Sequence, residues 1–271
     1  LVVGLGFKVV IVPFHMWAPD VYEGSPMPVT AYLSVASKSA SFVLMLRLFA
    51  TAFAPAVNDW RIIISALAVL TMTVGNLVAI SQTNLKRLMA YSSIGQAGFL
   101  LIGIASLSEM ASNAMILYIV GYSATTFAAF TCIIIVFNNT GRSRITDYAG
   151  LAHRSPLLAM VLTLSFFSLA GLPFFAGFTT KFYLFTTAAR EGLLWLVVVA
   201  MVNSLVSLYY YLNVVKQMYL HVSEDKSPLK IPPLSIAVLL GLTGVIILIG
   251  VYPGPISGLI QNATPILFPI S

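Results

Sequence analysis

The chain has 271 residues, of which 59% are hydrophobic and 8% are charged, and its mean hydropathy is +0.97. Soluble domains carry a charge on about a quarter of their residues, so 14 basic and 8 acidic side chains are too few to cover one. The formal net charge of +6 does not indicate nucleic-acid binding here, because excess Lys and Arg is typical of the cytoplasmic loops of membrane proteins. The composition predicts an integral membrane protein in a lipid bilayer.

The apolar segments predict an all-α, polytopic transmembrane helix bundle. A helix needs roughly 20 apolar residues to cross the hydrocarbon, and none of the segments alternates as barrel strands do. In chain order we predict a partial span at 1–14 and seven whole spans at 29–53, 60–82, 86–107, 113–137, 157–189, 193–220 and 232–252. The proline-containing residues 253–271 are predicted to form a tail. Because Leu1 lies inside an apolar run, we expect a C-terminal fragment of a longer polytopic protein.

Basic residues are concentrated in alternate loops. Loops 15–28, 83–86, 138–156 and 216–231 and their flanks hold Lys86, Arg87, Arg142, Arg144, Arg154, Lys216, Lys226 and Lys230. The opposite loops hold only Arg61 and Arg190, while Arg47 lies near a helix end, from which it can extend to the interface. Lys and Arg favour the cytoplasmic side, so we predict that the first set of loops is cytoplasmic and that the C-terminus lies outside.

Three lysines, Lys8, Lys38 and Lys181, are predicted to lie inside the membrane. Each would cost about 2.5–3.5 kcal/mol at mid-depth, and all 8 acidic residues fall in loops or at helix ends. A side chain that snorkels from a helix end is the alternative. A desolvated lysine without a carboxylate partner is driven towards its neutral form, which suits a proton carrier. We therefore predict a proton relay through these lysines, with a partner acid in a preceding segment or a neighbouring subunit.

Prolines predict two interrupted helices. The 157–189 span is longer than one crossing needs, and its candidate break residues are Gly171, Pro173 and Gly177. Proline removes a backbone donor and clashes with the preceding turn, so we predict breaks near Pro173 and near Pro13. Both sites read Val/Leu-Pro-Phe and each has a lysine nearby. Paired interrupted helices of this kind are typical of inverted-repeat transporters.

A polar axis is predicted beside the lysines. Ser92 and Gln96 are four residues apart and share a helix face, where they could hold a water chain. His15, just after the first break, is a further candidate. Close packing through small residues is the alternative explanation for the 86–107 helix. The run Tyr209-Tyr-Tyr211 is interpreted as an aromatic belt at the interface.

Motifs for redox, nucleotide or metal chemistry are missing from the sequence. There is no Walker loop and no G-x-G-x-x-G after a strand. The three histidines are scattered, and Cys132 is the only cysteine. We predict no metal site and no bound cofactor on this chain, so any redox chemistry would take place on other chains.

Six stretches of the chain resemble the antiporter-like membrane subunits of NADH-quinone oxidoreductase (respiratory complex I). They fall within residues 1 to about 220 and are Val12-Pro-Phe-His-Met-Trp-Ala-Pro-Asp-Val-Tyr-Glu-Gly24, Leu33-Ser-Val-Ala-Ser-Lys-Ser-Ala-Ser-Phe42, Asn84-Leu-Lys-Arg-Leu-Met-Ala-Tyr-Ser-Ser-Ile-Gly-Gln-Ala-Gly98, Ile145-Thr-Asp-Tyr-Ala-Gly-Leu151, Leu169-Ala-Gly-Leu-Pro-Phe-Phe-Ala-Gly-Phe-Thr-Thr-Lys181 and Leu208-Tyr-Tyr-Tyr-Leu212. They are most similar to subunit N, called subunit 2 in the chloroplast and cyanobacterial NAD(P)H–plastoquinone enzyme. Subunit L has a long lateral helix for which no room follows residue 252, and subunit M typically has a glutamate in place of Lys181.

The resemblance implies a fourteen-helix fold with two inverted five-helix repeats. Residues 1–53 would be the remainder of the first repeat, 60–220 the second repeat, 232–252 the final transmembrane helix and 253–271 a non-cytoplasmic tail. The family's three membrane lysines correspond to Lys8, Lys38 and Lys181, and its fifth-helix glutamate would precede Leu1. Many members have a histidine where this chain has Gln96, so this position either carries protons or orients water.

The function implied by the resemblance is proton translocation, coupled to electron transfer from NADH to quinone. The subunit would belong to an enzyme of the translocase class, with NADH, flavin, iron–sulfur clusters and quinone on other subunits. Its partners would be other membrane subunits, lipid, protons and internal water, in a bacterial cell (inner) membrane or a thylakoid membrane. Alternatives are a subunit of a multisubunit cation/proton antiporter or membrane-bound hydrogenase, and a non-conducting scaffold.

Overall fold

The computed structural model describes residues 2–223 and 227–267, a part of the chain that forms helices and no β-strand. The α-helices are α1 (Val2–Val9), α2 (Trp17–Gly24), α3 (Met27–Tyr32), α4 (Lys38–Thr51), α5 (Val57–Ile80), α6 (Leu85–Ala105), α7 (Glu109–Thr140), α8 (Leu151–Arg154), α9 (Pro156–Ala170), α10 (Ala176–Arg190), α11 (Leu194–Leu220), α12 (Pro233–Val251) and α13 (Gly254–Leu267). A π-helical turn, Leu33–Ser37, joins α3 to α4, and short 3-10 turns are found at Ala54–Ala56 and Ile145–Tyr148. Glu224, Asp225 and Lys226 of the predicted loop 216–231 lie outside the described residues.

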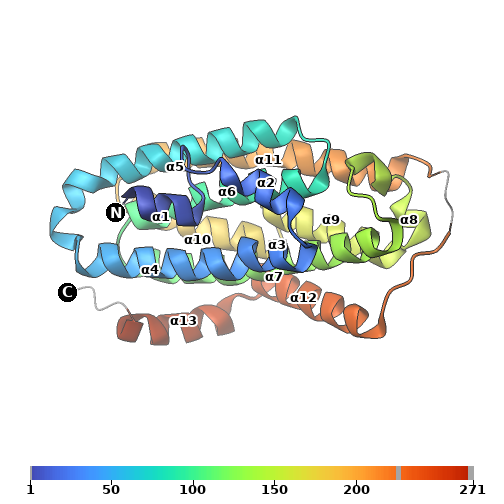
Figure 1. Ribbon diagram of the computed structural model, residues 1–271. Helices are drawn as coiled ribbons and strands as arrows, with labels where there is room; N and C mark the ends of the chain where they lie inside the picture. The colour runs from blue at the N-terminus through green and yellow to red at the C-terminus, as the bar shows by residue number, and fades with distance from the viewer. Residues whose placement is uncertain (1, 224–226, 268–271) are drawn as a thin grey trace.

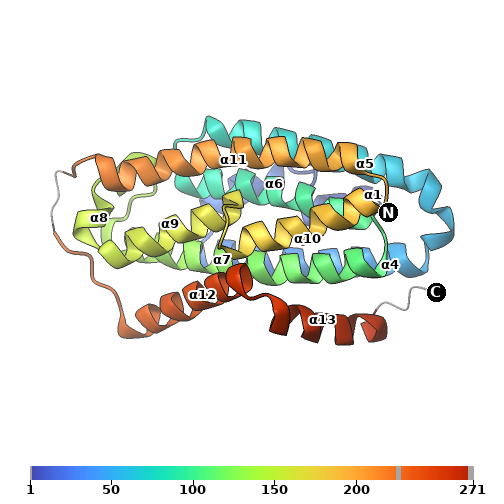
Figure 2. The same ribbon diagram turned by 180° about the vertical axis from the view of Figure 1, so that it is seen from behind.

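The helices form an elongated bundle in which α4, α5, α6, α7 and α11 run along one common direction (Figure 1). Figure 2 shows α9 and α10 placed end to end between α7 and α11, while α12 and α13 follow each other along the outside of α7. Connections between the helices are confined mainly to the two ends of the bundle (Figure 1). The common direction is therefore the axis along which the chain would cross a bilayer.

Six of the described helical segments are long and apolar enough to cross a membrane: Met27–Thr51, Ala54–Ile80, Leu85–Ala105, Glu109–Thr140, Leu194–Leu220 and Pro233–Val251. They match six of the seven predicted whole spans. The predicted span at 157–189 is divided into α9 and α10, neither of which is long enough by itself. The all-α bundle is thus confirmed, and the seventh predicted span is the interrupted pair.

Helix α6 lies at the centre of the bundle, and 94% of its most apolar stretch of 18 residues is buried. Small residues allow α5 to approach it closely: a Cβ atom at Gly98 would lie 2.6 Å from the Met72 nitrogen, and one at Gly75 would lie 2.7 Å from the Gly95 nitrogen. Asn84 begins the helix by accepting a hydrogen bond from the Lys86 backbone at 2.8 Å. This central position is why the polar side chains of α6 point into the protein.

Two helix interruptions occur where prolines predicted them. Between α1 and α2 the chain leaves helical geometry at Val10 (φ 65°) and passes through Pro13. Between α9 and α10, Gly171 (φ 89°) ends the first helix in the left-handed conformation that glycine tolerates best, and Pro173 follows. At the second break the freed carbonyls of Leu169 and Ala170 face the protein interior, where they accept hydrogen bonds from Lys181, as membrane depth requires.

The structure corrects three details of the prediction. The predicted loop 15–28 is mostly helical, because α2 continues the interrupted helix and buries Tyr22. The predicted tail contains helix α13. Pro255 does not prevent this helix, because it lies in the first turn, where proline is tolerated. Gly177 is not in the break but inside α10, where a Cβ atom would collide with the carbonyl of Ser168.

Candidate functional site

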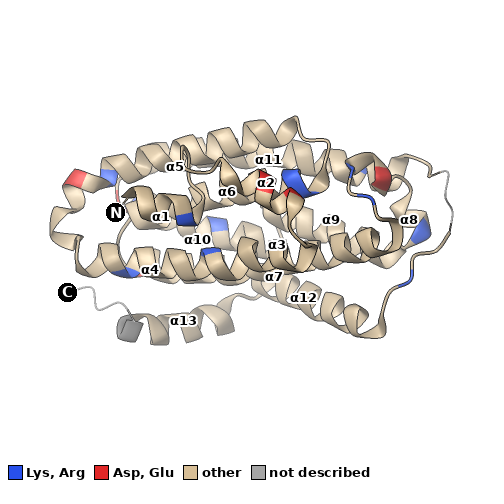
Figure 3. Ribbon diagram, in the orientation of Figure 1, with Lys and Arg blue, Asp and Glu red and all other residues tan. Residues whose placement is uncertain are grey.

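Most charged residues lie near the two ends of the bundle, and only a few basic residues lie along the middle of its helices (Figure 3). Lys38 and Lys181 are buried, with 2% and 4% of their surface exposed. Within the described residues, neither lysine forms an ion pair, and the ion pairs found there join Arg87 to Asp20 and Glu23, and Arg61 to Glu191. Lys38 and Lys181 are thus buried without a carboxylate partner among the described residues.

Lys8 differs from the other two lysines. It lies in the last turn of α1 and is exposed on the described part of the chain. It therefore does not join the buried polar cluster that contains Lys38. The predicted helix break follows Lys8, between α1 and α2. His15, which lies just beyond this break, is buried, and its Nδ1 atom has no hydrogen-bond partner among the described residues.

The ammonium group of Lys38 is held by α6. It donates a hydrogen bond to the Ser93 carbonyl at 2.7 Å and a second, short one to the Ser93 hydroxyl. The π-helical turn Leu33–Ser37 comes directly before Lys38. Such turns widen a helix by one residue per turn and are frequent at functional sites. Lys38 is thus desolvated but hydrogen-bonded, the arrangement that makes burial of a polar group tolerable.

Tyr122 of α7 continues the network from Ser93. Its hydroxyl donates to the Ser93 hydroxyl at 3.3 Å and contacts both the carbonyl and the hydroxyl of Ser34 at 3.2 Å. Tyr22 of α2 approaches Ser93 from another side, at 3.5 Å between the hydroxyl oxygens. Helices α2 and α7 therefore converge with α4 on one serine of α6.

The ammonium group of Lys181 lies at the second helix break. It donates to the Leu169 carbonyl at 3.0 Å, to the Ala170 carbonyl at 3.2 Å and to the Ser204 hydroxyl at 2.9 Å. It also lies 4.5 Å from the centre of the Phe99 ring, within reach of a cation–π interaction. The interruption of α9 therefore supplies the carbonyl oxygens that hold this lysine.

Gln96 links the two halves of the site. Its Nε2 atom donates to the Leu169 carbonyl at 3.1 Å, and the Tyr118 hydroxyl donates a short hydrogen bond to its Oε1 atom. A cavity of about 10 Å³ separates this group from Tyr122 and is lined by Gln96, Tyr118, Tyr122 and Lys181 among others. That volume is close to the minimum that one water molecule requires. The cavity therefore has room for about one water molecule beside side chains of both the Lys38 cluster and the Lys181 cluster.

Ser92 forms a short hydrogen bond with Tyr211 of α11. Its predicted place on a polar axis with Gln96 stays a prediction. Tyr210 donates to the Asn76 amide oxygen at 3.1 Å, and Tyr210 and Tyr211 are both buried, so the interpretation as an interfacial belt is wrong for these two residues. Tyr209 is exposed, and for it the belt stays a prediction. A helix places successive side chains on different faces, and this separates Tyr209 from its two neighbours.

Sequence reasoning missed four of the residues that complete the site: Ser93, Tyr118, Tyr122 and Ser204. Tyr118 and Tyr122 are four residues apart on α7, a spacing that places both on one face. This signal was available, but nothing in the sequence showed that this face meets α6. The described residues contain no group of His, Cys, Asp and Glu that could hold a metal ion.

The sequence matches the family model described as NADH:quinone oxidoreductase/Mrp antiporter, TM, over residues 1–207. The chain belongs to this family. It is 46% identical over 95% of its length to NADH-quinone oxidoreductase subunit N of Desulforamulus reducens, and 48% identical over 84% of its length to NAD(P)H-quinone oxidoreductase subunit 2 of Synechocystis. These stretches make up 54% and 44% of the two relatives, so the chain spans about half the length of the curated relatives it matches.

Solved structures of this family share the fold. The chain is similar to one in respiratory complex I from Thermus thermophilus with bound aureothin, with a TM-score of 0.80 and 34% identity over 97% of this chain and 57% of that one. It is also similar to a chain of the Mrp complex from Dietzia, with a TM-score of 0.89 over 97% of this chain and 57% of that one; at 23% identity this shows the fold alone. The antiporter-like fold predicted from the sequence is confirmed, and both structures are of membrane complexes.

Proposed function

We propose that this chain is part of a proton-translocating membrane subunit of NADH:quinone oxidoreductase. The observation that carries the proposal is a row of polar groups between two buried lysines. Hydrogen bonds join Lys38, Ser93 and Tyr122, and Tyr122, Gln96 and Lys181 line one common cavity of about 10 Å³. Polar groups at this depth are costly. Proton transfer needs a row of polar groups that are linked by hydrogen bonds, with room for a water molecule where the row is interrupted.

In the proposed mechanism Lys38 receives a proton and passes it along this path to Lys181, which exchanges it with the far side of the membrane. The hydroxyl groups of Ser93 and Tyr122 both donate and accept hydrogen bonds, so they can relay a proton without holding a charge. A positive charge on one lysine repels a proton on the other. An electrostatic change in a neighbouring subunit would therefore drive the proton onward.

Lys8, Lys38 and Lys181 are the relay residues in this proposal, with Ser92, Gln96 and His15 along the polar axis. Lys8 would work with an acid outside this chain. NADH, flavin, iron–sulfur clusters and quinone would be bound by other subunits. The high identity to the quinone oxidoreductase subunits favours this assignment over a cation/proton antiporter or hydrogenase subunit.

We further propose the membrane orientation and the domain division that the sequence predicts. Loops 83–86, 138–156 and 216–231, with the region of α2, would face the cytoplasm, and α13 would lie towards the opposite side. Residues 1–53 would complete the first inverted repeat and residues 60–220 would form the second. The membrane would be a bacterial cell membrane or a thylakoid membrane.

Replacing Lys181 in the intact complex tests this function. Lys181→Met removes the titrating group but keeps most of the side-chain volume, so protons pumped per electron, measured in proteoliposomes, should fall together with turnover. The control is Lys216→Met, because Lys216 is an exposed lysine at the end of α11. Unchanged pumping and turnover in an assembled Lys181→Met complex would support a non-conducting scaffold instead.

A further inference from the structure

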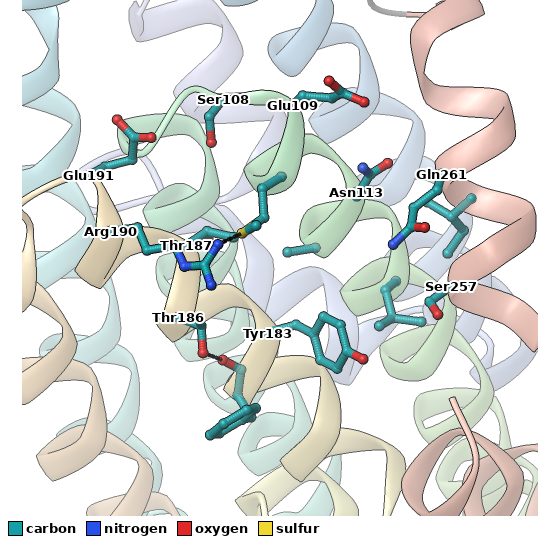
Figure 4. A pocket seen from close by; sticks show the side chains of 15 residues that line it. Ser108, Glu109, Asn113, Tyr183, Thr186, Thr187, Arg190, Glu191, Ser257 and Gln261 are labelled. Carbon is teal, nitrogen blue, oxygen red and sulfur yellow. Dashed lines mark hydrogen bonds between the residues drawn. The ribbon is translucent and has the colours of Figure 1, made fainter. Parts of the chain in front are cut away.

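A cavity of about 800 Å³ lies apart from the lysine path, between the start of α7, the end of α10 and α13 (Figure 4). Tyr183, Thr186 and Arg190 face it from α10, and Asn113 faces it from α7 (Figure 4). On the third side it is closed by Ser257 and Gln261 of α13. No step of the proposed relay uses these residues.

The lining changes in character along the helices. Glu109, Arg190 and Glu191 line the cavity at the helix ends, where Figure 4 shows Glu109 at the start of α7 and Glu191 next to Arg190 at the end of α10. Leu117 and Phe182 lie eight residues further along α7 and α10 from Glu109 and Arg190; both line the cavity, Leu117 as a buried side chain and Phe182 as an exposed one. At a rise of 1.5 Å per residue this is a depth of about 12 Å. A charged mouth above an apolar interior matches a molecule with a polar head and a hydrocarbon chain.

Charged side chains of both signs at the helix ends, Glu109 and Arg190, are open to interact with a ligand. Glu191 pairs with Arg61 at 3.6 Å, but Arg190 and Glu109 form no ion pair with any described residue. The Arg190 guanidinium instead reaches the Met110 sulfur at 3.6 Å, a weak acceptor. An arginine is suited to bind a phosphate through two parallel hydrogen bonds. A nearby carboxylate favours a cation next to that phosphate.

Glu109 favours a hydrogen-bond donor on the ligand. Its carboxylate forms no ion pair with any described residue, so it is open to accept hydrogen bonds from a ligand. A primary ammonium group has N–H donors for this carboxylate, whereas a quaternary ammonium group does not. The Oδ1 atom of Asn113 also has no partner among the described residues, but it is buried too deeply for a ligand in the cavity to reach it.

We propose that this cavity binds one aminophospholipid of the phosphatidylethanolamine type. The phosphate contacts Arg190, the primary ammonium donates hydrogen bonds to Glu109, and one acyl chain extends along Leu117 and Phe182. The charges at the helix ends complement a zwitterion. The Glu109 carboxylate selects ethanolamine over choline, because only the primary ammonium has N–H groups to donate to it. The site is independent of the lysine relay, so its failure would leave the proposed function untouched.

The test is the lipid content of the purified intact complex. After exchange into phosphatidylcholine nanodiscs, quantitative mass spectrometry should find about one phosphatidylethanolamine more per wild-type complex than per Arg190→Gln complex. Ala114→Phe, which fills the cavity without changing charge, should lose the same molecule. Ser257→Phe blocks it from α13 and replaces Ala114→Phe if that complex does not assemble.

Arg47→Gln is the matched control, because Arg47 is an exposed arginine near a helix end outside the cavity lining. It should retain the lipid. Equal phosphatidylethanolamine in all variants would overturn the proposal, as would equal retention of phosphatidylcholine or phosphatidylglycerol when these are supplied instead. Protein density filling the cavity in a structure of the complex would also overturn it.

Discussion

Lys181 and Gln96 share one acceptor, since both donate to the Leu169 carbonyl, at 3.0 and 3.1 Å. That carbonyl lies in the last turn of α9, just before the break that begins at Gly171. The broken helix therefore joins the lysine of α10 to the glutamine of the central helix α6. A continuous helix would have used this carbonyl in its own hydrogen bonds.

Gln96→Leu should slow the enzyme and destabilise the subunit. The change leaves the buried Tyr118 hydroxyl without its acceptor, at a cost of about 1–3 kcal/mol. We expect at least a several-fold loss of proton pumping in proteoliposomes and a lower melting temperature. Gln96→His, which keeps both a donor and an acceptor, should retain most of the pumping; equal losses in the two variants would show that polarity at this position is not what matters.

Ser93→Ala should impair transfer from Lys38 without unfolding the protein. Lys38 keeps the Ser93 carbonyl but loses the hydroxyl that connects it to Tyr122. We expect roughly a tenfold fall in turnover, equivalent to about 1.4 kcal/mol. Ser106→Ala is the control, because this buried serine bonds only the Ile102 carbonyl of its own helix; a comparable fall there would argue against a relay through Ser93.

Tyr211→Phe and Tyr209→Phe form a matched pair on α11. Tyr211 is buried and bonds Ser92, while Tyr209 is exposed. Removing the buried hydroxyl takes away its short hydrogen bond with Ser92 and should destabilise the subunit by about 1–3 kcal/mol, whereas Tyr209→Phe should change stability by less than about 0.5 kcal/mol. Thermal unfolding of the purified complexes measures both, and identical melting temperatures would contradict the assigned burial.

Gly177→Ala should prevent the two halves of the broken helix from packing together. Its new Cβ atom would collide with the Ser168 carbonyl, a backbone atom that cannot rotate away. Overpacking of this kind costs about 1–3 kcal/mol or more, so less subunit should be incorporated into the complex, as measured by immunoblotting of membranes. Gly241→Ala on α12, where no atom lies within 4 Å of the added Cβ, should be incorporated normally.

Much of the fold could be read from the sequence, since span positions depend on runs of apolar residues and the helix breaks on Pro13, Gly171 and Pro173. These are local properties of the chain. The sequence did not reveal α2 within the predicted loop 15–28 or the helical form of the tail. Short helices with proline in or before their first turn have too few apolar residues to be predicted as helices from hydropathy. Helix α2 is stabilised instead by packing of its buried side chains against neighbouring helices.

The sequence by itself determined that this is a membrane protein and that Lys38 and Lys181 are its unusual charges, because the cost of burying a lysine depends on its position along an apolar segment. Only the tertiary structure decided what those lysines contact. Lys38 forms its hydrogen bonds with Ser93 rather than Ser92, and Tyr211 is directed into the protein, where it bonds Ser92. Both contacts depend on the rotation of α6 about its axis relative to α4 and α11. Helix rotation is set by close packing at residues such as Gly98 and Gly75, and that fit exists only once the helices are together.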